Sequence, residues 1–160
     1  MKIDQLILTI LALPLLGALI NGTLGKRLPK LISGSIATGV MFVAFALAYI
    51  VFNSNHEVTF IHLFKVLNLD HVVLNARFQV DRLSTLMLLI VTGVGALIHL
   101  FSMGYMKEDE GYYKFFTYLN LFIFSMLLLI LGSNYFMLFF GWEGVGICSY
   151  LLIGFHYSDK

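Results

Sequence analysis

The sequence predicts an all-α polytopic membrane protein with about five transmembrane helices and one short β-hairpin. The chain of 160 residues is 59% hydrophobic but only 12% charged, and its mean hydropathy is +0.90. A typical soluble domain is about 25% charged, so this chain lacks the charge needed to cover a water-facing surface. Charge-free runs long enough to cross a bilayer recur along it, and one glutamate interrupts the last of them.

The charge-free runs define the spans, because about 20 apolar helical residues cross a hydrocarbon core of roughly 30 Å. Residues 115–155 form a run of 41 with a single formal charge. One helix of that length would measure about 61 Å, twice the core thickness, so we expect two spans that turn at residues 132–134. The five spans are expected at residues 3–25, 31–53, 83–106, 113–131 and 134–156, within a single module of residues 1–160.

Between the second and third spans, residues 54–80 are expected to form a β-hairpin on the outer face of the membrane. Val72, Leu74, Ala76, Phe78 and Val80 alternate with mostly polar residues, which is the period-two pattern of a half-buried strand. The turn is expected within residues 67–70. The next residue after the alternating run is Asp81, whose carboxylate is expected to cap the third span.

The basic residues predict the orientation of the spans. One side of the membrane receives Lys26, Arg27, Lys30, Lys107, Lys114 and Lys160, and the other receives Lys2, Lys65, Arg77 and Arg82. The larger number marks the inner side, so we expect the N-terminus outside and the C-terminus inside. The first span is longer than the apolar core of a signal peptide, and we expect it to be retained.

Several classes of site are not supported by the sequence. The net charge of +1 does not suggest a nucleic-acid partner. Cys148 is the single cysteine, and neither a Cys/His cluster with metal-ligand spacing nor a nucleotide-binding glycine motif is present. We therefore expect no metal and no cofactor in this chain, and the lipid bilayer as its immediate surroundings.

Glu143 is the candidate site, because an ionised carboxylate near the bilayer centre costs roughly 2.5–3.5 kcal/mol on insertion scales. Small residues surround it in the sequence, namely Gly141, Gly144, Gly146, Cys148 and Ser149. In membranes such residues are typical of close helix packing, so we expect this helix to be buried among others with Glu143 directed into protein.

Two interpretations of Glu143 stay open at this point. It is either a structural group bonded to a neighbouring span, or a carboxyl that exchanges protons under the influence of a mobile cation. The lysines and arginines all fall in loops or at span ends, away from the middle of the spans, so a cationic partner is expected from outside this chain. His99, within the third span, is a weaker candidate for a proton relay, and a hydrogen-bonded structural role is its alternative.

Four stretches also resemble a known family. Residues 141–154 read GWEGVGICSYLLIG, and the other stretches are FQVDRLS at 78–84, LIHLFSMGYM at 97–106 and FFTYLNLF at 115–122. They resemble, in order and spacing, the largest antiporter-like membrane subunit of respiratory complex I, known as subunit L or subunit 5 of NADH:quinone oxidoreductase. The resemblance is most specific between residues 78 and 157.

The resemblance implies a proton-translocating subunit that couples quinone reduction to proton transfer. Glu143 then corresponds to the coupling carboxyl, which pairs in the family with a lysine on a later helix. NADH, FMN, iron–sulfur clusters and quinone are expected in partner subunits, so the chain itself carries no redox chemistry. The expected partners are the other membrane-arm subunits, in a bacterial plasma membrane or a mitochondrial inner membrane.

The family has more than five spans, so the resemblance implies only a partial antiporter-like fold here. Either the sequence is a fragment of a longer subunit or a second polypeptide completes it. Two other functions remain as alternatives. One is a related subunit of a multi-component Na+/H+ antiporter or membrane-bound hydrogenase, and the other is a structural membrane anchor or assembly component without proton transfer.

Overall fold

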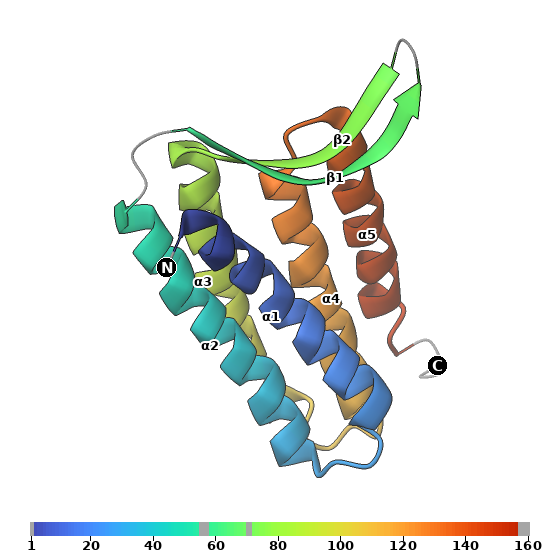
Figure 1. Ribbon diagram of the computed structural model, residues 1–160. Helices are drawn as coiled ribbons and strands as arrows, with labels where there is room; N and C mark the ends of the chain where they lie inside the picture. The colour runs from blue at the N-terminus through green and yellow to red at the C-terminus, as the bar shows by residue number, and fades with distance from the viewer. Residues whose placement is uncertain (1, 55–57, 70–71, 157–160) are drawn as a thin grey trace.

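The computed structural model describes residues 2–54, 58–69 and 72–156 and shows five long helices with a two-stranded antiparallel sheet (Figure 1). The elements are α1 (Ile3–Leu24), α2 (Lys30–Ser54), β1 (Thr59–Leu69), β2 (Val72–Val80), α3 (Arg82–Tyr105), α4 (Tyr112–Leu131) and α5 (Tyr135–Ile153). All five helices are long and apolar enough to cross a membrane. The predicted all-α membrane architecture with one β-hairpin is therefore confirmed.

Helices α1 to α4 form a bundle in which α1 packs on α2 and α4, and α3 packs on the same two helices. Pro14 lies inside α1, which continues through it from Ile3 to Leu24. Helix α5 lies at the edge, where it packs on α4 and more lightly on β2 (Figure 1). Its buried share is 17%, against 33–44% for the other four helices. One side of α5 is therefore uncovered.

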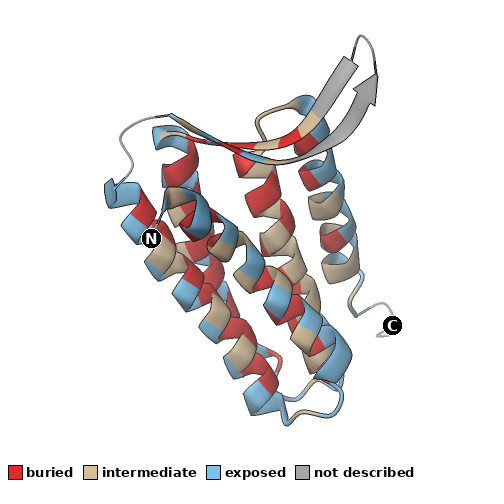
Figure 2. Ribbon diagram, in the orientation of Figure 1, coloured by how far each residue is buried: buried red, intermediate tan, exposed pale blue. Residues whose placement is uncertain are grey.

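Buried residues recur along all five helices (Figure 2), and they form two apolar clusters. The larger lies towards the hairpin and includes Ile10, Met41, Leu88 and Leu127 together with the buried face of the sheet. The smaller consists of Ala37, Met106, Tyr112 and Phe116, near the opposite end. We call this opposite end, where residues 25–29 and 106–111 connect the helices, the lysine-rich end.

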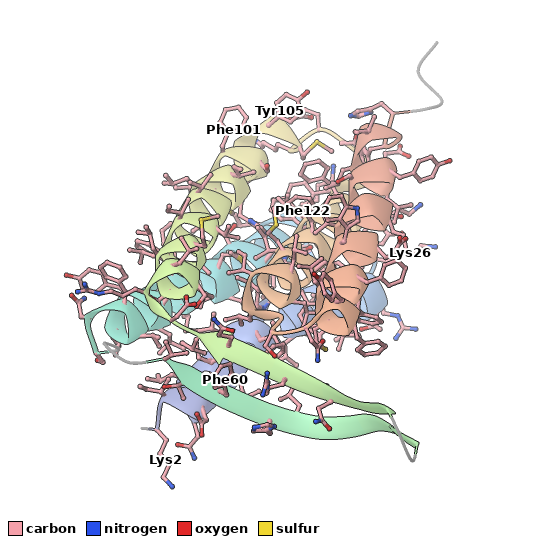
Figure 3. All side chains as sticks on the ribbon, turned by 90° about the horizontal axis from the view of Figure 1, so that it is seen from above. Lys2, Lys26, Phe60, Phe101, Tyr105 and Phe122 are labelled. Carbon is pink, nitrogen blue, oxygen red and sulfur yellow. The ribbon has the colours of Figure 1, made fainter. Side chains whose placement is uncertain are left out.

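The outer surface of the bundle is apolar and aromatic, as expected for helices that face lipid. Seen from above in Figure 3, Phe101 and Tyr105 project outward from the end of α3. Both side chains are about 70% exposed, at 72% and 69%. A water-facing surface seldom carries large exposed apolar patches, so this surface agrees with a multi-pass membrane protein.

The hairpin lies across the helix ends opposite the lysine-rich end (Figures 1 and 3). Ala76, Phe78 and Val80 are buried, whereas the alternating Arg77 and Gln79 are only half-buried, which confirms the period-two prediction for this part of β2. The expected turn at residues 67–70 was too long, because β1 continues to Leu69. Backbone pairing with β2 out to Val72 extends the strand.

Asp81 links the hairpin to α3 and caps the helix as predicted. Its carboxylate accepts from the backbone N–H of Ser84 at 2.8 Å and from the side-chain amide of Gln79 at 2.8 Å. The Ser84 backbone bond, followed by the Gln79 bond, lowers the pKa of Asp81 below its usual value. Both donors favour the ionised carboxylate, so the cap is strongest when Asp81 is charged.

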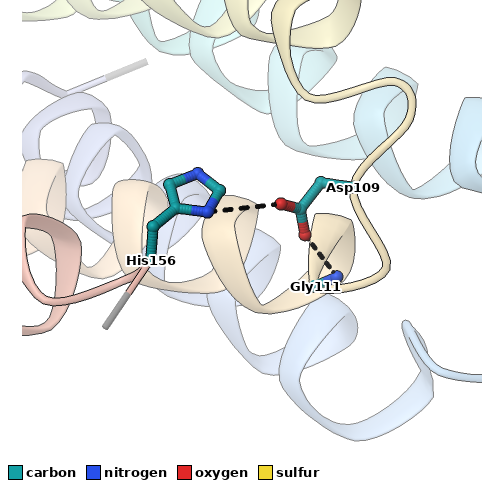
Figure 4. Close-up of polar contacts among 3 residues, drawn as sticks. All are labelled: Asp109, Gly111 and His156. Atoms are coloured by element: carbon teal, nitrogen blue, oxygen red, sulfur yellow. Dashed lines mark hydrogen bonds and ion pairs between the residues drawn. The ribbon is translucent and has the colours of Figure 1, made fainter. Parts of the chain in front are cut away.

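At the lysine-rich end, the connection between α3 and α4 touches the end of α5 (Figure 4). Asp109 accepts from the backbone N–H of Gly111 at 2.6 Å, and its second oxygen lies 3.7 Å from Nδ1 of His156. On the other side, Nζ of Lys30 donates to the carbonyl of Lys107 at 3.0 Å. The same connection thus contacts the start of α2 and the end of α5.

Candidate functional site

Helix α5 starts from a turn that β2 holds in place. Ser133 donates its backbone N–H and its hydroxyl to the carbonyl of Arg77, at 3.1 and 2.8 Å. Asn134 donates its side-chain amide to the carbonyl of Asn75 at 2.6 Å and accepts from the N–H of Met137 at 3.0 Å. The second bond caps α5. Both the starting point and the direction of α5 are therefore fixed by the hairpin.

Close contact with α4 sets the rotation of α5 about its axis. A methyl group on Gly141 would lie 2.6 Å from the backbone nitrogen of Leu129, so only glycine lets the two backbones approach this closely. A methyl group on Gly144 would lie 2.6 Å from Oγ of Ser125. Cys148 is buried on the same side of the helix. Three of the small residues that the sequence placed around the site therefore face α4.

The other two small residues lie differently. Gly146 has nothing within 4 Å of the position that a methyl group would take, and Ser149 is half-buried. Gly146 belongs to the side of α5 that lies away from α4. A helix turns about 100° per residue, so a position two residues after Gly141 points roughly 200° away from it.

Glu143 is at that position, and its side chain is exposed. It lies eight residues into α5, about 12 Å from the first turn and close to the middle of the span. Its helical neighbours on the same side are apolar and exposed, with Phe139 at 63% and Tyr150 at 78%. We call the surface formed by Phe139, Glu143, Gly146, Ile147 and Tyr150 the open face of α5.

Within the part of the chain that the structure describes, Glu143 forms no ion pair. The described helices carry their lysines and arginines at or near their ends, away from the middle of α5. An ionised carboxylate facing hydrocarbon is unstable unless it is paired or hydrated. The open face therefore supplies one carboxylate, an apolar surround and no cation.

His99 is not part of this arrangement. It is fully buried inside the α1–α4 bundle, and its Nδ1 donates to the carbonyl of Gly95 at 2.7 Å. Its ring packs 6.0 Å from that of Phe116. The open face, by contrast, is directed away from the bundle. Any role of His99 is therefore separate from that of Glu143 within the described residues.

Sequence reasoning missed three buried polar side chains in the spans. Asn21, Thr38 and Asn120 are each at most 5% exposed. A carboxamide inside an apolar span is a signal of the same kind as Glu143, only weaker because the group carries no charge. That signal was available in the sequence for Asn21 and Asn120. Their positions relative to His99 depend on how the helices pack, which the sequence does not show.

A family model matches the middle of the chain, and several relatives match nearly all of it. Residues 67–116 match the family model described as NADH-Ubiquinone oxidoreductase (complex I), chain 5 N-terminus. This match covers the second strand, α3 and the start of α4. It includes two of the four stretches on which the sequence resemblance depends.

Whole-chain relatives extend the similarity. The chain is 40% identical over 154 residues to NADH-quinone oxidoreductase subunit L of Rickettsia bellii, covering 94% of this chain and 24% of the relative. It is also 40% identical over 149 residues to NADH-ubiquinone oxidoreductase chain 5 of Metridium senile, covering 91% of this chain and 25% of the relative. Over 86 residues it is 60% identical to the subunit L of Pseudomonas aeruginosa, covering 54% of this chain and 14% of the relative. The chain thus spans about a quarter of the length of the first two relatives.

Proposed function

Because the chain is homologous along nearly its whole length to subunit L and chain 5 of the NADH:quinone oxidoreductases, we propose that it serves in the proton-translocating membrane arm of such a complex. In this proposal Glu143 is the carboxyl that couples the complex to proton transfer. The observation that supports it most strongly is the open face of α5, where a single carboxylate near mid-membrane has no cation within the described residues.

The partner of Glu143 is then a lysine from outside this chain. A lysine ammonium close to the carboxylate favours the ionised form, whereas its withdrawal leaves the carboxyl in apolar surroundings that favour the protonated form. A helix that moves its lysine between these positions makes Glu143 release and then recover a proton. The exposed Phe139 and Tyr150 offer that helix an apolar surface, and Gly146 allows it to approach closely.

The remaining parts of the proposal follow from the homology. NADH, FMN, iron–sulfur clusters and quinone bind to partner subunits, and this chain contributes proton transfer without redox chemistry. The membrane is an energy-transducing one. The lysine-rich end faces the cytoplasm or matrix, with the N-terminus on the opposite side, because Lys26, Arg27, Lys30, Lys107 and Lys114 gather at that end.

The test is proton pumping by the complete complex carrying Glu143→Gln, reconstituted into vesicles and driven by NADH and quinone. Glutamine keeps the size and hydrogen bonding of the side chain but cannot exchange the proton. The matched control is Glu108→Gln, which makes the same change at an exposed position of the α3–α4 connection. We expect the Glu143 variant to assemble and to lose pumping, and the control to pump normally.

A structural anchor predicts the opposite result, with both variants assembled and pumping alike. If Glu143→Gln prevents assembly, Glu143→Asp separates the two roles, because it keeps the exchangeable proton and shortens the side chain. Pumping by assembled Glu143→Asp, at a reduced rate, supports the proposal. Alanine removes the exchangeable proton altogether. Unimpaired pumping by an assembled Glu143→Ala complex therefore contradicts the proposal.

A further inference from the structure

Four buried polar atoms in the α1–α4 bundle have no hydrogen-bond partner among the residues that the structure describes. They are Nδ2 of Asn21, Oγ1 of Thr38, Nε2 of His99 and Oδ1 of Asn120. One comes from each helix of the bundle. The four residues are 0–5% exposed, so a helix packing on the outside of the bundle does not reach them. Buried polar groups in proteins are almost always paired with protein or with ordered water.

Three of the four lie at one level of the bundle, as the packing around Gly95 shows. A methyl group on Gly95 of α3 would lie 2.9 Å from Cδ1 of Ile123 in α4 and 3.0 Å from Cε of Met41 in α2. These three residues therefore mark a single layer where α2, α3 and α4 meet.

One turn away from that layer, each helix carries a partnerless atom. Thr38 precedes Met41 by three residues, Asn120 precedes Ile123 by three, and His99 follows Gly95 by four. Since α3 runs antiparallel to α2 and α4 (Figure 1), all three displacements point towards the lysine-rich end. Thr38, His99 and Asn120 thus share one polar layer, about 9–12 Å from that end by helical rise.

Asn21 of α1 joins this layer to the lysine-rich end. Oδ1 of Asn120 would lie 2.9 Å from a methyl group on Gly17, so it faces α1 one turn from Asn21. Asn21 in turn accepts from the hydroxyl of Ser33 at 2.7 Å. Ser33 also lines a cavity of about 390 Å³ at the lysine-rich end, whose other walls include Lys30 and Tyr112.

The free atoms are complementary to water. The carbonyl of Gly95 can only accept, so Nδ1 of His99 carries the proton and the neutral ring leaves Nε2 as an acceptor. Oδ1 of Asn120 also accepts, Nδ2 of Asn21 donates, and the hydroxyl of Thr38 does both. A water molecule offers two donors and two acceptors, and buried waters typically form about three such bonds.

We propose that the lysine-rich half of the α1–α4 bundle is a water-binding site that begins at the Ser33 cavity and ends at His99. Its waters connect Asn21, Asn120 and Thr38 with Nε2 of His99. Towards the hairpin, the large apolar cluster around Met41 and Leu127 closes the route. The site is therefore a blind, hydrated half-channel through which His99 exchanges protons with one side of the membrane, independently of Glu143.

The test is a density map of the complete complex at a resolution that shows ordered water, together with radiolytic hydroxyl labelling. We expect water density within hydrogen-bond distance of Nε2 of His99 and Oδ1 of Asn120, and labelling of Phe116, whose ring lies beside His99. Asn120→Leu removes one acceptor and fills the space, so both signals are expected to disappear. The control is Thr92→Val, whose buried hydroxyl already donates to the carbonyl of Leu88 at 2.7 Å.

Two results overturn the proposal. One is a dry layer in which the four side chains bond directly to one another or to backbone carbonyls. The other is water and labelling that persist unchanged in Asn120→Leu. If that variant does not assemble, Thr38→Val takes its place, because valine removes the hydroxyl that would bind the water. Loss of both signals in Thr38→Val then supports the proposal, and signals that persist unchanged overturn it.

Discussion

Asn134 and Asn75 lie in contact across the turn that begins α5, with Nδ2 of Asn134 donating to the carbonyl of Asn75 at 2.6 Å. Oδ1 of the same side chain caps α5 by accepting from the N–H of Met137. One side chain therefore connects the hairpin to the helix that carries Glu143. The depth and direction of the carboxylate depend on an extramembrane strand.

Asn134→Asp and Asn134→Ala separate the two bonds. Aspartate retains an acceptor for the cap and loses the donor to Asn75, whereas alanine loses both. A cap is worth about 0.5–2 kcal/mol and a hydrogen bond about 0.5–1.5 kcal/mol. We expect the free energy of unfolding in mixed detergent micelles to fall in the order wild type, Asn134→Asp, Asn134→Ala. An Asn134→Asp variant as stable as the wild type would show that the hairpin contact contributes nothing, and equal losses for the two variants would show the same of the cap.

The small residues of α5 form a second series. Gly141→Ala places a methyl group 2.6 Å from the backbone of Leu129, so α4 and α5 must separate, and overpacking of this kind costs about 1–3 kcal/mol. Gly146→Ala meets nothing within the described residues and is expected to leave the unfolding free energy of this chain unchanged.

Gly146→Ala also tests whether a partner helix packs on the open face. In the assembled complex, Gly146→Ala is expected to weaken the interface at the open face, which subunit retention after detergent extraction would measure. An interface as strong as that of the wild type would show that no helix backbone approaches Gly146. It would also weaken the argument that the open face is covered by protein.

Asp81 predicts a dependence of stability on pH. Its pKa is lowered in the folded protein by the Ser84 and Gln79 bonds. The ionised cap therefore stabilises the fold above the unfolded pKa, near 3.8, and this contribution is lost as the pH falls through the lower folded pKa. Asp81→Asn can still accept from Ser84 but has no charge to lose. We expect the stability difference between wild type and Asp81→Asn to shrink between about pH 5 and pH 2, as followed by unfolding of the detergent-solubilised chain. A difference independent of pH would contradict the assignment.

The cap of α3 and the turn between α4 and α5 were both predictable because their signals are local. An aspartate next to an alternating strand and a Gly-Ser-Asn triplet inside a double-length apolar run each act within a few residues. The expected hairpin turn was too long, because residues 67–69 pair with β2 and a pairing between strands is not visible in the residues of one strand alone.

The position of Glu143 was only partly predictable. Helical periodicity alone places Glu143 on the side opposite Gly141, but the sequence does not show which side α4 occupies. The contact of Gly141 with Leu129 decides it. The polar layer of Thr38, His99 and Asn120 was out of reach of sequence reasoning, because it depends on the relative heights of three separate helices.

The most direct test of the coupling role is the position of Glu143 in a structure of the complete complex. We predict a lysine ammonium from outside residues 1–160 that lies on the open face of α5 in at least one state of the complex. Its separation from the carboxylate should be about 4 Å, the usual limit of an ion pair. A Glu143 side chain that faces lipid, or that bonds only to neutral groups in every state, would contradict the account.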